Sequence, residues 1–240
     1  VMPFVFALFA AVYLFGMNGL GLQTIQKVAI CVGALTVGYR QVLGLPGMWA
    51  ILMLRFLPTV AWGIASLVIP LYLYRLAGNA TVPGTYALVS LAVASAGQLA
   101  TGRVIDRGAR ARGSAVAEAP SGTVPSPLRR LVLVISGALL MAAASTGFAT
   151  ADVAALVVTG TGWTTMAWAL STTMPPLMRA VSPPDAHGRV VGVTHLTWSA
   201  AMLTGTTVGG MLVPLDPVAP IIAATTCLAL SAVVAARFAR

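Results

Sequence analysis

The sequence predicts an all-α, polytopic membrane protein. Apolar residues make up 58% of the chain and charged residues only 8%, and the mean hydropathy of +0.93 lies far outside the range of soluble domains. A helix needs roughly 20 consecutive apolar residues to cross a bilayer core about 30 Å thick. Uncharged runs of about that length recur along the chain. Composition and run length together therefore exclude an ordinary soluble domain.

Each long apolar run predicts one transmembrane helix. The first, residues 1–22, follows no basic segment and precedes no small-residue cleavage site, so we expect a truncated start rather than a signal peptide. Residues 23–47 predict a cytoplasmic or interfacial connector, or a plain linker, because the uncharged stretch between Lys27 and Arg40 is too short to cross. Six further runs predict six more spans: residues 56–74, 86–102, 131–151, 153–175, 190–213 and 218–236.

The basic residues sort to one side of the membrane if the six later spans alternate in direction. Of the 14 Lys and Arg residues, all but Arg75 then fall on the same side. Lys and Arg are retained on the cytoplasmic side during insertion. We therefore expect an integral protein of the bacterial plasma (inner) membrane with a cytoplasmic C-terminus and a long cytoplasmic loop at residues 103–130.

That loop concentrates much of the chain's scarce charge at its start, in the stretch TGRVIDRGARARG, residues 101–113. Gly102, Asp106, Arg107 and Arg110 give it an order that resembles the G-x-x-x-D-R-x-G-R-R loop of the major facilitator superfamily. The match departs from the family at Gly108, which comes one place early. A charged loop can also serve as a topological anchor alone, without any further role.

Two other segments are similar to the same superfamily. RFLPTVAWGIASLVIPLYLYRL, residues 55–76, resembles the seventh helix of its drug-exporter-like and sugar-efflux-like branches. VSPPDAHGRVVGVTHLTWSAAMLTGTTVGG, residues 181–210, resembles a loop and helix with a Pro-rich turn, although Thr206 replaces a family proline. The resemblance makes residues 48–240 helices seven to twelve, a six-helix half built as a 3+3 inverted repeat. Residues 1–22 would be helix six.

The resemblance implies a function and a partner. It implies a secondary active transporter that moves a small organic solute by alternating access, present here as a partial chain. An N-terminal six-helix half, missing or separate, would then be the partner. By the same resemblance, Asp106 contacts the cytoplasmic end of a helix in the opposite half and holds the inner gate shut. Arg107 and Arg110 would complete that contact or bind anionic membrane lipid.

Polar and aromatic side chains inside the predicted spans are candidates for a substrate path, because such groups are costly in lipid and tend to face a cavity or another helix. Bonding to the helix's own carbonyls or to a neighbouring helix is the alternative. His195, the one ionisable side chain well inside a predicted span, could also exchange a proton. The candidates are Trp62, Tyr86, Gln98, Thr161, Thr164, Trp168, His195 and Trp198.

Gly205, Gly209 and Gly210 form a small-residue face on one predicted span. The four-residue spacing of Gly205 and Gly209 lets two helix backbones approach closely, and Gly210 widens the groove. We expect a helix-packing role, with a flexible gating point as the alternative.

Other classes of function receive little support from the sequence. The five acidic residues and two histidines are scattered, and no phosphate-binding loop is present, so we expect no catalytic site, metal site or cofactor. The net charge of +9 has no soluble basic domain to carry it, so nucleic acid is not an expected partner. An accessory or structural membrane subunit is the main alternative, and a membrane-embedded enzyme is less favoured.

Overall fold

The computed structural model describes residues 40–110 and 124–240. Its chain divides into two compact units, residues 1–45 and 46–240. The expected helix at residues 1–22 and most of the expected connector at 23–47 lie outside the described residues. In the first unit the description is confined to a short helical segment at residues 40–43 and the turn that follows it. The second unit contains all the longer described helices.

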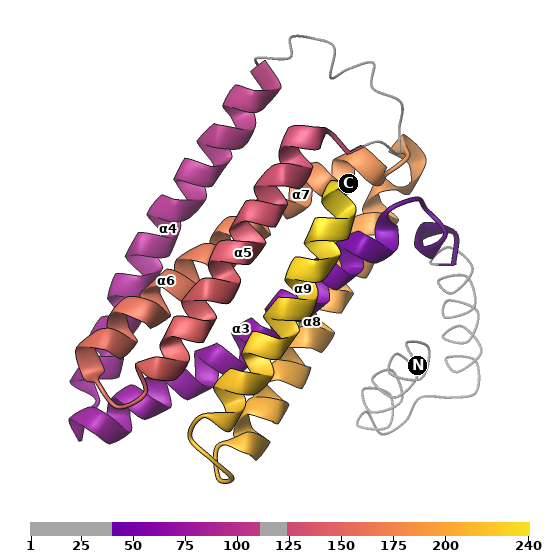
Figure 1. Cartoon of the computed structure of the whole chain (residues 1–240). Coiled ribbons are helices and arrows are strands. Elements are labelled where there is room, and N and C mark those ends of the chain that lie inside the picture. The colour runs from indigo at the N-terminus through magenta and orange to yellow at the C-terminus, as the bar shows by residue number, and fades with distance from the viewer. Residues whose placement is uncertain (1–39, 111–123) are drawn as a thin grey trace, which may run out of the picture. The chain divides into compact units, whose positions relative to one another are not determined.

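The second unit consists of helices, and its described residues contain no strand (Figure 1). Seven α-helices and one 3-10 turn follow one another in the order α3 (Met48–Ala77), α4 (Thr81–Arg110), α5 (Ser126–Phe148), α6 (Val153–Thr172), α7 (Met174–Val181), η2 (Pro184–Ala186), α8 (His187–Leu212) and α9 (Ala219–Ala239).

Five of these helical segments are long and apolar enough to cross a membrane: α3, α4, α5, the continuous α6–α7 segment and α9. The chain is therefore an all-α polytopic membrane protein. The remaining predicted span, residues 190–213, is also helical, as α8, and at 26 residues it is about 39 Å long. It is not among the five because its threonines, glycines and His195 interrupt the apolar stretch that a membrane-crossing helix needs. A helix of that length and mixed polarity is suited to face a polar surface as well as lipid.

The helices extend beyond the apolar runs that predicted them. α3 begins at Met48, before the run at residues 56–74, and α4 continues to Arg110, past the run at residues 86–102. Of the expected cytoplasmic loop at 103–130, the first eight residues continue α4 as helix and the last five begin α5. Arg and Ala are good helix formers, and a helix of 30 residues, about 45 Å long, must project beyond a bilayer core of about 30 Å.

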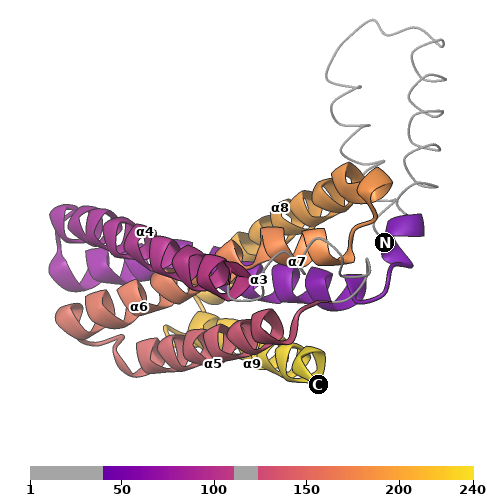
Figure 2. The same ribbon diagram turned by 90° about the horizontal axis from the view of Figure 1, so that it is seen from above.

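α3 is the central helix of the unit. It packs against α8, α9, α6 and α4, and Ile51, Leu54, Ile64 and Leu73 along it are almost completely buried. α4 is peripheral by contrast, since it buries only Tyr86, Ser90 and Ala94. Figure 2 shows α4 and α8 on one side of the unit and α5 and α9 on the other. α3 is therefore the element against which the other helices are positioned.

The contacts between the long helices follow an internal symmetry. When α3, α4 and α5 are matched in order with α6, α8 and α9, most contacts have a counterpart. α3 packs on α8 as α6 packs on α4, and α3 packs on α9 as α6 packs on α5. The contact between α3 and α6 joins two matched helices, and so does the contact between α5 and α9. Two smaller contacts, α3 with α4 and α8 with α9, have no counterpart of similar extent between α6 and α8 or between α4 and α5. The six long helices of the second unit therefore fall into two consecutive groups of three that pack in a similar way.

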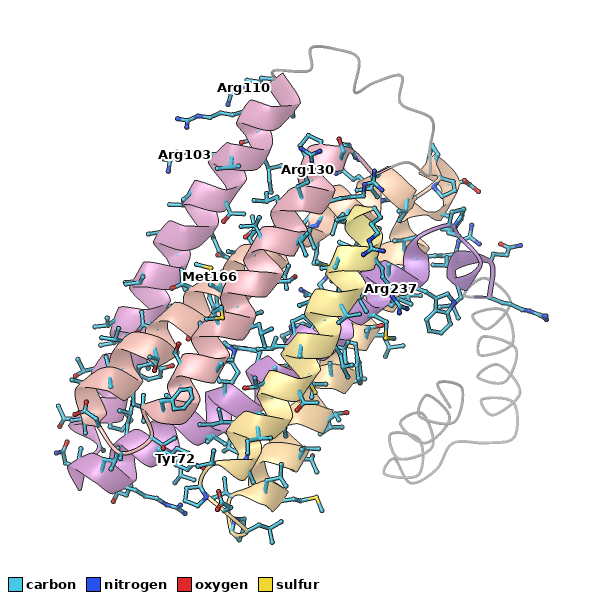
Figure 3. The ribbon with its side chains drawn as sticks, viewed as in Figure 1. Tyr72, Arg103, Arg110, Arg130, Met166 and Arg237 are labelled. Carbon is cyan, nitrogen blue, oxygen red and sulfur yellow. The ribbon has the colours of Figure 1, made fainter. Side chains whose placement is uncertain are left out.

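Nine arginines of the second unit lie at one end of the helices, whereas Arg75, in the last turn of α3, lies at the other end. The end of α4, the start of α5, α7, the start of α8 and the end of α9 lie together at the end with the nine arginines, and Arg110 and Arg130 lie at the opposite end of the unit from Tyr72 (Figure 3). The turns after α3, α5 and α8 lie at the other end. The nine arginines at the end of the unit where α4 and α9 end are Arg103, Arg107, Arg110, Arg129, Arg130, Arg179, Arg189, Arg237 and Arg240.

Candidate functional site

A pocket of about 340 Å³ lies between α3, α4, the α6–α7 segment and α8. α5 and α9 contribute no residue to its wall. Three tryptophans and five polar side chains line it together with apolar residues. They are Trp62, Trp168 and Trp198, and Arg55, Thr59, Gln98, Ser171 and His195.

Five of the predicted path residues meet in this pocket, although they come from four different helices. Trp62 comes from α3, Gln98 from α4, Trp168 from α6, and His195 and Trp198 from α8. The side chains of Trp62, Gln98 and Trp168 are half-buried, whereas those of His195 and Trp198 are exposed. The pocket therefore presents a mixed aromatic and polar surface to whatever enters it.

The other three predicted path residues, Tyr86, Thr161 and Thr164, do not line the pocket. The Tyr86 hydroxyl lies 3.4 Å from the Thr164 hydroxyl oxygen in a buried contact between α4 and α6. The Thr164 hydroxyl also donates to the Gly160 carbonyl at 2.9 Å. The Thr161 hydroxyl is buried and has no hydrogen-bond partner in the described part of the chain.

The crossing of α4 over α6 explains this division. Gly97 and Thr165 meet there so closely that a β-carbon on Gly97 would lie 2.6 Å from the Thr165 methyl group. α4 therefore packs directly on the α6 residues Thr164 and Thr165. Residues beyond this crossing, Trp168 and Ser171, line the pocket instead.

Arg55 is a pocket residue that the sequence analysis does not identify as a site residue. It is the eighth residue of α3, half-buried, and its Nη1 donates a hydrogen bond of 2.9 Å to the Ser171 hydroxyl on α6. In the sequence it serves only as a boundary charge before an apolar run. Its spacing to Thr59 and Trp62, four and seven residues away, places all three on one face of a helix and could have identified it.

A smaller pocket of about 120 Å³ adjoins the same side chains. Arg55, Ser171, Met174 and His195 line both pockets, and Met178 and Thr194 extend the second one toward the junction of α7 and α8. The polar part of the site therefore centres on Arg55, Ser171 and His195.

The charged motif lies away from both pockets. Arg103, Asp106, Arg107 and Arg110 are exposed and recur at positions i, i+3, i+4 and i+7, so they form one charged face on the last turns of α4. Arg103 and Arg110 project away from the other helices (Figure 3). Asp106 has no hydrogen bond or ion pair within the described residues, and a β-carbon on Gly102 would meet nothing within 4 Å.

The predicted glycine face lies where α8 packs on α3. A β-carbon on Gly205 would overlap the Val60 carbonyl oxygen, and one on Gly209 would lie 3.3 Å from the Ile64 Cα. A β-carbon on Gly210 would meet only the Leu67 side chain, at 3.7 Å. Gly205 and Gly209 thus permit the close approach, and Gly210 lies at its margin.

Comparison with family models and with curated proteins finds no match to the chain. Among the described residues no group of three or more His, Cys, Asp or Glu side chains is placed to hold a metal ion.

Proposed function

We propose that the chain is the C-terminal six-helix half of a secondary active transporter of the major facilitator superfamily, which moves a small organic solute by alternating access. The observation that carries the proposal is the pocket between α3, α4, α6–α7 and α8, with three tryptophans and a half-buried arginine in its wall. A cavity of mostly apolar lining with a few converging polar groups is the usual form of a small-molecule site.

The exchange relationship between the two groups of helices supports the same proposal. A 3+3 inverted repeat places equivalent helices of the two groups in equivalent environments, with the substrate site at the interface of the repeats. α3 and α6 are equivalent in that sense, as are α4 and α8, and these are the helices that line the pocket. α5 and α9, the third helix of each group, are the ones that do not.

The gathering of arginines supports an orientation. The end of the unit that holds the nine helix-end arginines would face the cytoplasm of a bacterial inner membrane, and the C-terminus would lie on that side. Anionic lipid heads would then meet the charged face of α4. The exposed Asp106 would be available to a second, N-terminal six-helix half, which we propose as the partner.

An accessory or structural membrane subunit is the second candidate. Leu88, Leu91 and Leu99 are exposed along α4, which buries few of its own residues. Such a helix can pack against a partner without any transport by this chain. The two candidates make different predictions about the pocket. In a transporter the pocket opens in turn to each side of the membrane, whereas in an accessory subunit it does not.

Thiol labelling of the Gln98→Cys variant tests this difference. The substitution is made in a background in which Cys31 and Cys227 are replaced by alanine, and the chain is studied in right-side-out and inside-out membrane vesicles of the cells that make it. An alternating-access carrier exposes the introduced thiol to a membrane-impermeant reagent from both sides, at rates that change in opposite directions when a solute gradient is applied. Labelling from a single side under all conditions favours the accessory subunit.

Leu88→Cys is the matched control for this experiment. Leu88 lies on the same helix, is 73% exposed and lines no described pocket. A thiol at this position should face lipid and should be labelled from neither side. The comparison separates access through the pocket from access along the outer surface of α4.

A further inference from the structure

We propose that the pocket binds an organic anion, with Arg55 as the anchor for the anionic group and the three tryptophans as the surface for an apolar body. That this anion is also the transported solute rests on the proposed function. The binding itself depends only on the pocket.

The charge of the pocket points to an anion. Arg55 is half-buried in a membrane helix, and its hydrogen bond to Ser171 uses one of the five N–H donors of a guanidinium. Cations inside a membrane protein are costly unless they meet a counter-charge. Neither pocket has an Asp or Glu in its wall. A carboxylate on the ligand would supply the missing counter-charge through charge-assisted hydrogen bonds.

The acidic residues of the described chain lie elsewhere. They are found at helix ends or turns, at Asp106, Asp152, Asp185 and Asp216. None of them lines either pocket. Within residues 40–110 and 124–240, no carboxylate of either pocket wall balances the positive charge of Arg55, and a ligand could do so.

The rest of the wall points to an aromatic or similarly flat apolar body. Trp62, Trp168 and Trp198 approach the pocket from three different helices, α3, α6 and α8. Leu54, Pro58 and Met174 add apolar surface. Large flat rings stack on tryptophan and bury much area at little entropic cost. A pocket of about 340 Å³ is at the small end of the range for ligand sites, about 300 to 1,000 Å³.

The hydrogen-bonding groups of the pocket disfavour a sugar. Thr59 donates its hydroxyl to the Arg55 carbonyl at 2.6 Å, and Ser171 accepts from Arg55. Gln98 is the one pocket amide, and it has no hydrogen bond to the described protein. The further donors of the wall are the N–H groups of Arg55 and the tryptophans, so the pocket offers few acceptors to the hydroxyl groups of a sugar, and each hydroxyl left unpaired in the site costs free energy. An organic cation would meet Arg55 without any compensating carboxylate.

Three fluorescent probes with the same ring system test the inference on the purified chain in lipid nanodiscs. Dansylglycine carries a carboxylate, dansylglycinamide is its neutral counterpart, and dansylcadaverine carries an ammonium group. Energy transfer from tryptophan to the dansyl ring reports binding next to the pocket tryptophans. We expect saturable transfer with dansylglycine and an affinity at least tenfold lower for the other two probes.

Substitution of Arg55 separates the anchor from general apolar binding. Arg55→Gln should lower the affinity for dansylglycine at least tenfold and leave that for dansylglycinamide unchanged, and Arg55→Lys should retain part of the difference between the two probes. Arg75→Gln, at the other end of the same helix and outside both pockets, should change neither affinity. Circular dichroism and thermal unfolding check that each variant is folded.

Two results would overturn the inference: no saturable transfer with dansylglycine in the folded chain, or a dansylglycine affinity in Arg55→Gln within twofold of the unsubstituted value. The labelling experiment on Gln98→Cys uses none of these probes. Two-sided labelling without anion preference would therefore reject the substrate class and leave the carrier proposal standing. Preference for the anionic probe together with labelling from one side only would support the anion site and reject the carrier proposal.

Discussion

Gly63 of α3 and Gly205 of α8 face each other where the two helices cross, and a β-carbon on Gly63 would lie 3.0 Å from the Gly205 Cα. Neither backbone can approach this closely if a side chain intervenes. α3 carries Arg55 and Trp62, and α8 carries His195. The glycine contact therefore fixes the spacing of two walls of the pocket.

Replacement of Gly205 by alanine should destabilise the unit by about 1 to 3 kcal/mol, the usual cost of overpacking a well-packed contact. The reason is that the added methyl group would overlap the Val60 carbonyl oxygen, which belongs to a helix backbone and cannot rotate away. Thermal unfolding in detergent, followed by circular dichroism, measures the change. Gly210→Ala on the same helix is the control, since its methyl group would meet the Leu67 side chain at an ordinary 3.7 Å. Equal unfolding temperatures for the two variants would remove the packing role from Gly205.

The helices are largely predictable from the sequence because membrane insertion is governed by a one-dimensional property, the length of an apolar run. Every run predicted within residues 48–240 falls inside a described helix or extends past its end by a few residues. The ends are less predictable, as the extension of α4 to Arg110 illustrates. Beyond the bilayer core the apolar signal stops, while the helix continues on the propensity of residues such as Arg and Ala.

The pocket is harder to predict, because it depends on which helix covers which face. Thr161, Thr164 and Trp168 share one face of α6, and their spacing does not distinguish them. The crossing of α4 at Gly97 separates them in space, so that Trp168 lines the pocket and the threonines do not. Arg55 escapes prediction for a related reason, since a rule that ends each span at its first charge discards a charged residue that lies within the helix.

The arrangement of charges gives a sharp prediction of sidedness. Ser126→Cys, exposed at the start of α5, should react with an impermeant thiol reagent only from the cytoplasmic side. Ala80→Cys, exposed in the turn between α3 and α4, should react only from the outer side. Both variants are made without Cys31 and Cys227 and are studied in oriented vesicles. Labelling of the Ser126→Cys variant from outside would reverse the proposed orientation, because helix-end arginines would then lie on the outer face.

Asp106→Asn should leave the stability of this chain within about 0.5 kcal/mol of its original value, because the carboxylate is exposed and no hydrogen bond or ion pair to the described residues is lost. In membranes that also contain the partner half, the same change should shift the resting state inward. An interaction of about 1.4 kcal/mol would change the ratio of inward to outward states tenfold. Labelling of a Gln98→Cys thiol from the cytoplasmic side measures that ratio.

The neighbouring arginines provide the control for Asp106. Arg103→Gln removes a charge from the same face of α4 without touching the carboxylate. A gate formed by Asp106 predicts that Asp106→Asn changes the labelling of the Gln98→Cys thiol more than Arg103→Gln does. Equal effects on membrane insertion, with no effect of either on that labelling, would make the charged face a topological anchor only.

His195 lies beside the proposed anchor of the anion. It lines both pockets together with Arg55, the only other charged or titratable side chain in either wall among the described residues of α3, α4, α6, α7 and α8. The ring nitrogens of a histidine can form hydrogen bonds, so we expect His195 to contact a ligand carboxylate that Arg55 holds.

His195→Ala should therefore lower the affinity for dansylglycine about three- to tenfold, the usual effect of losing one hydrogen bond. His195→Gln keeps a hydrogen-bonding side chain and should retain most of that affinity. Tryptophan-to-dansyl energy transfer measures both variants. Dansylglycinamide is the internal control, because it lacks the carboxylate that His195 would contact and its affinity should change less. If His195→Ala binds dansylglycine as tightly as the unsubstituted chain, His195 forms part of the pocket wall without contacting the ligand.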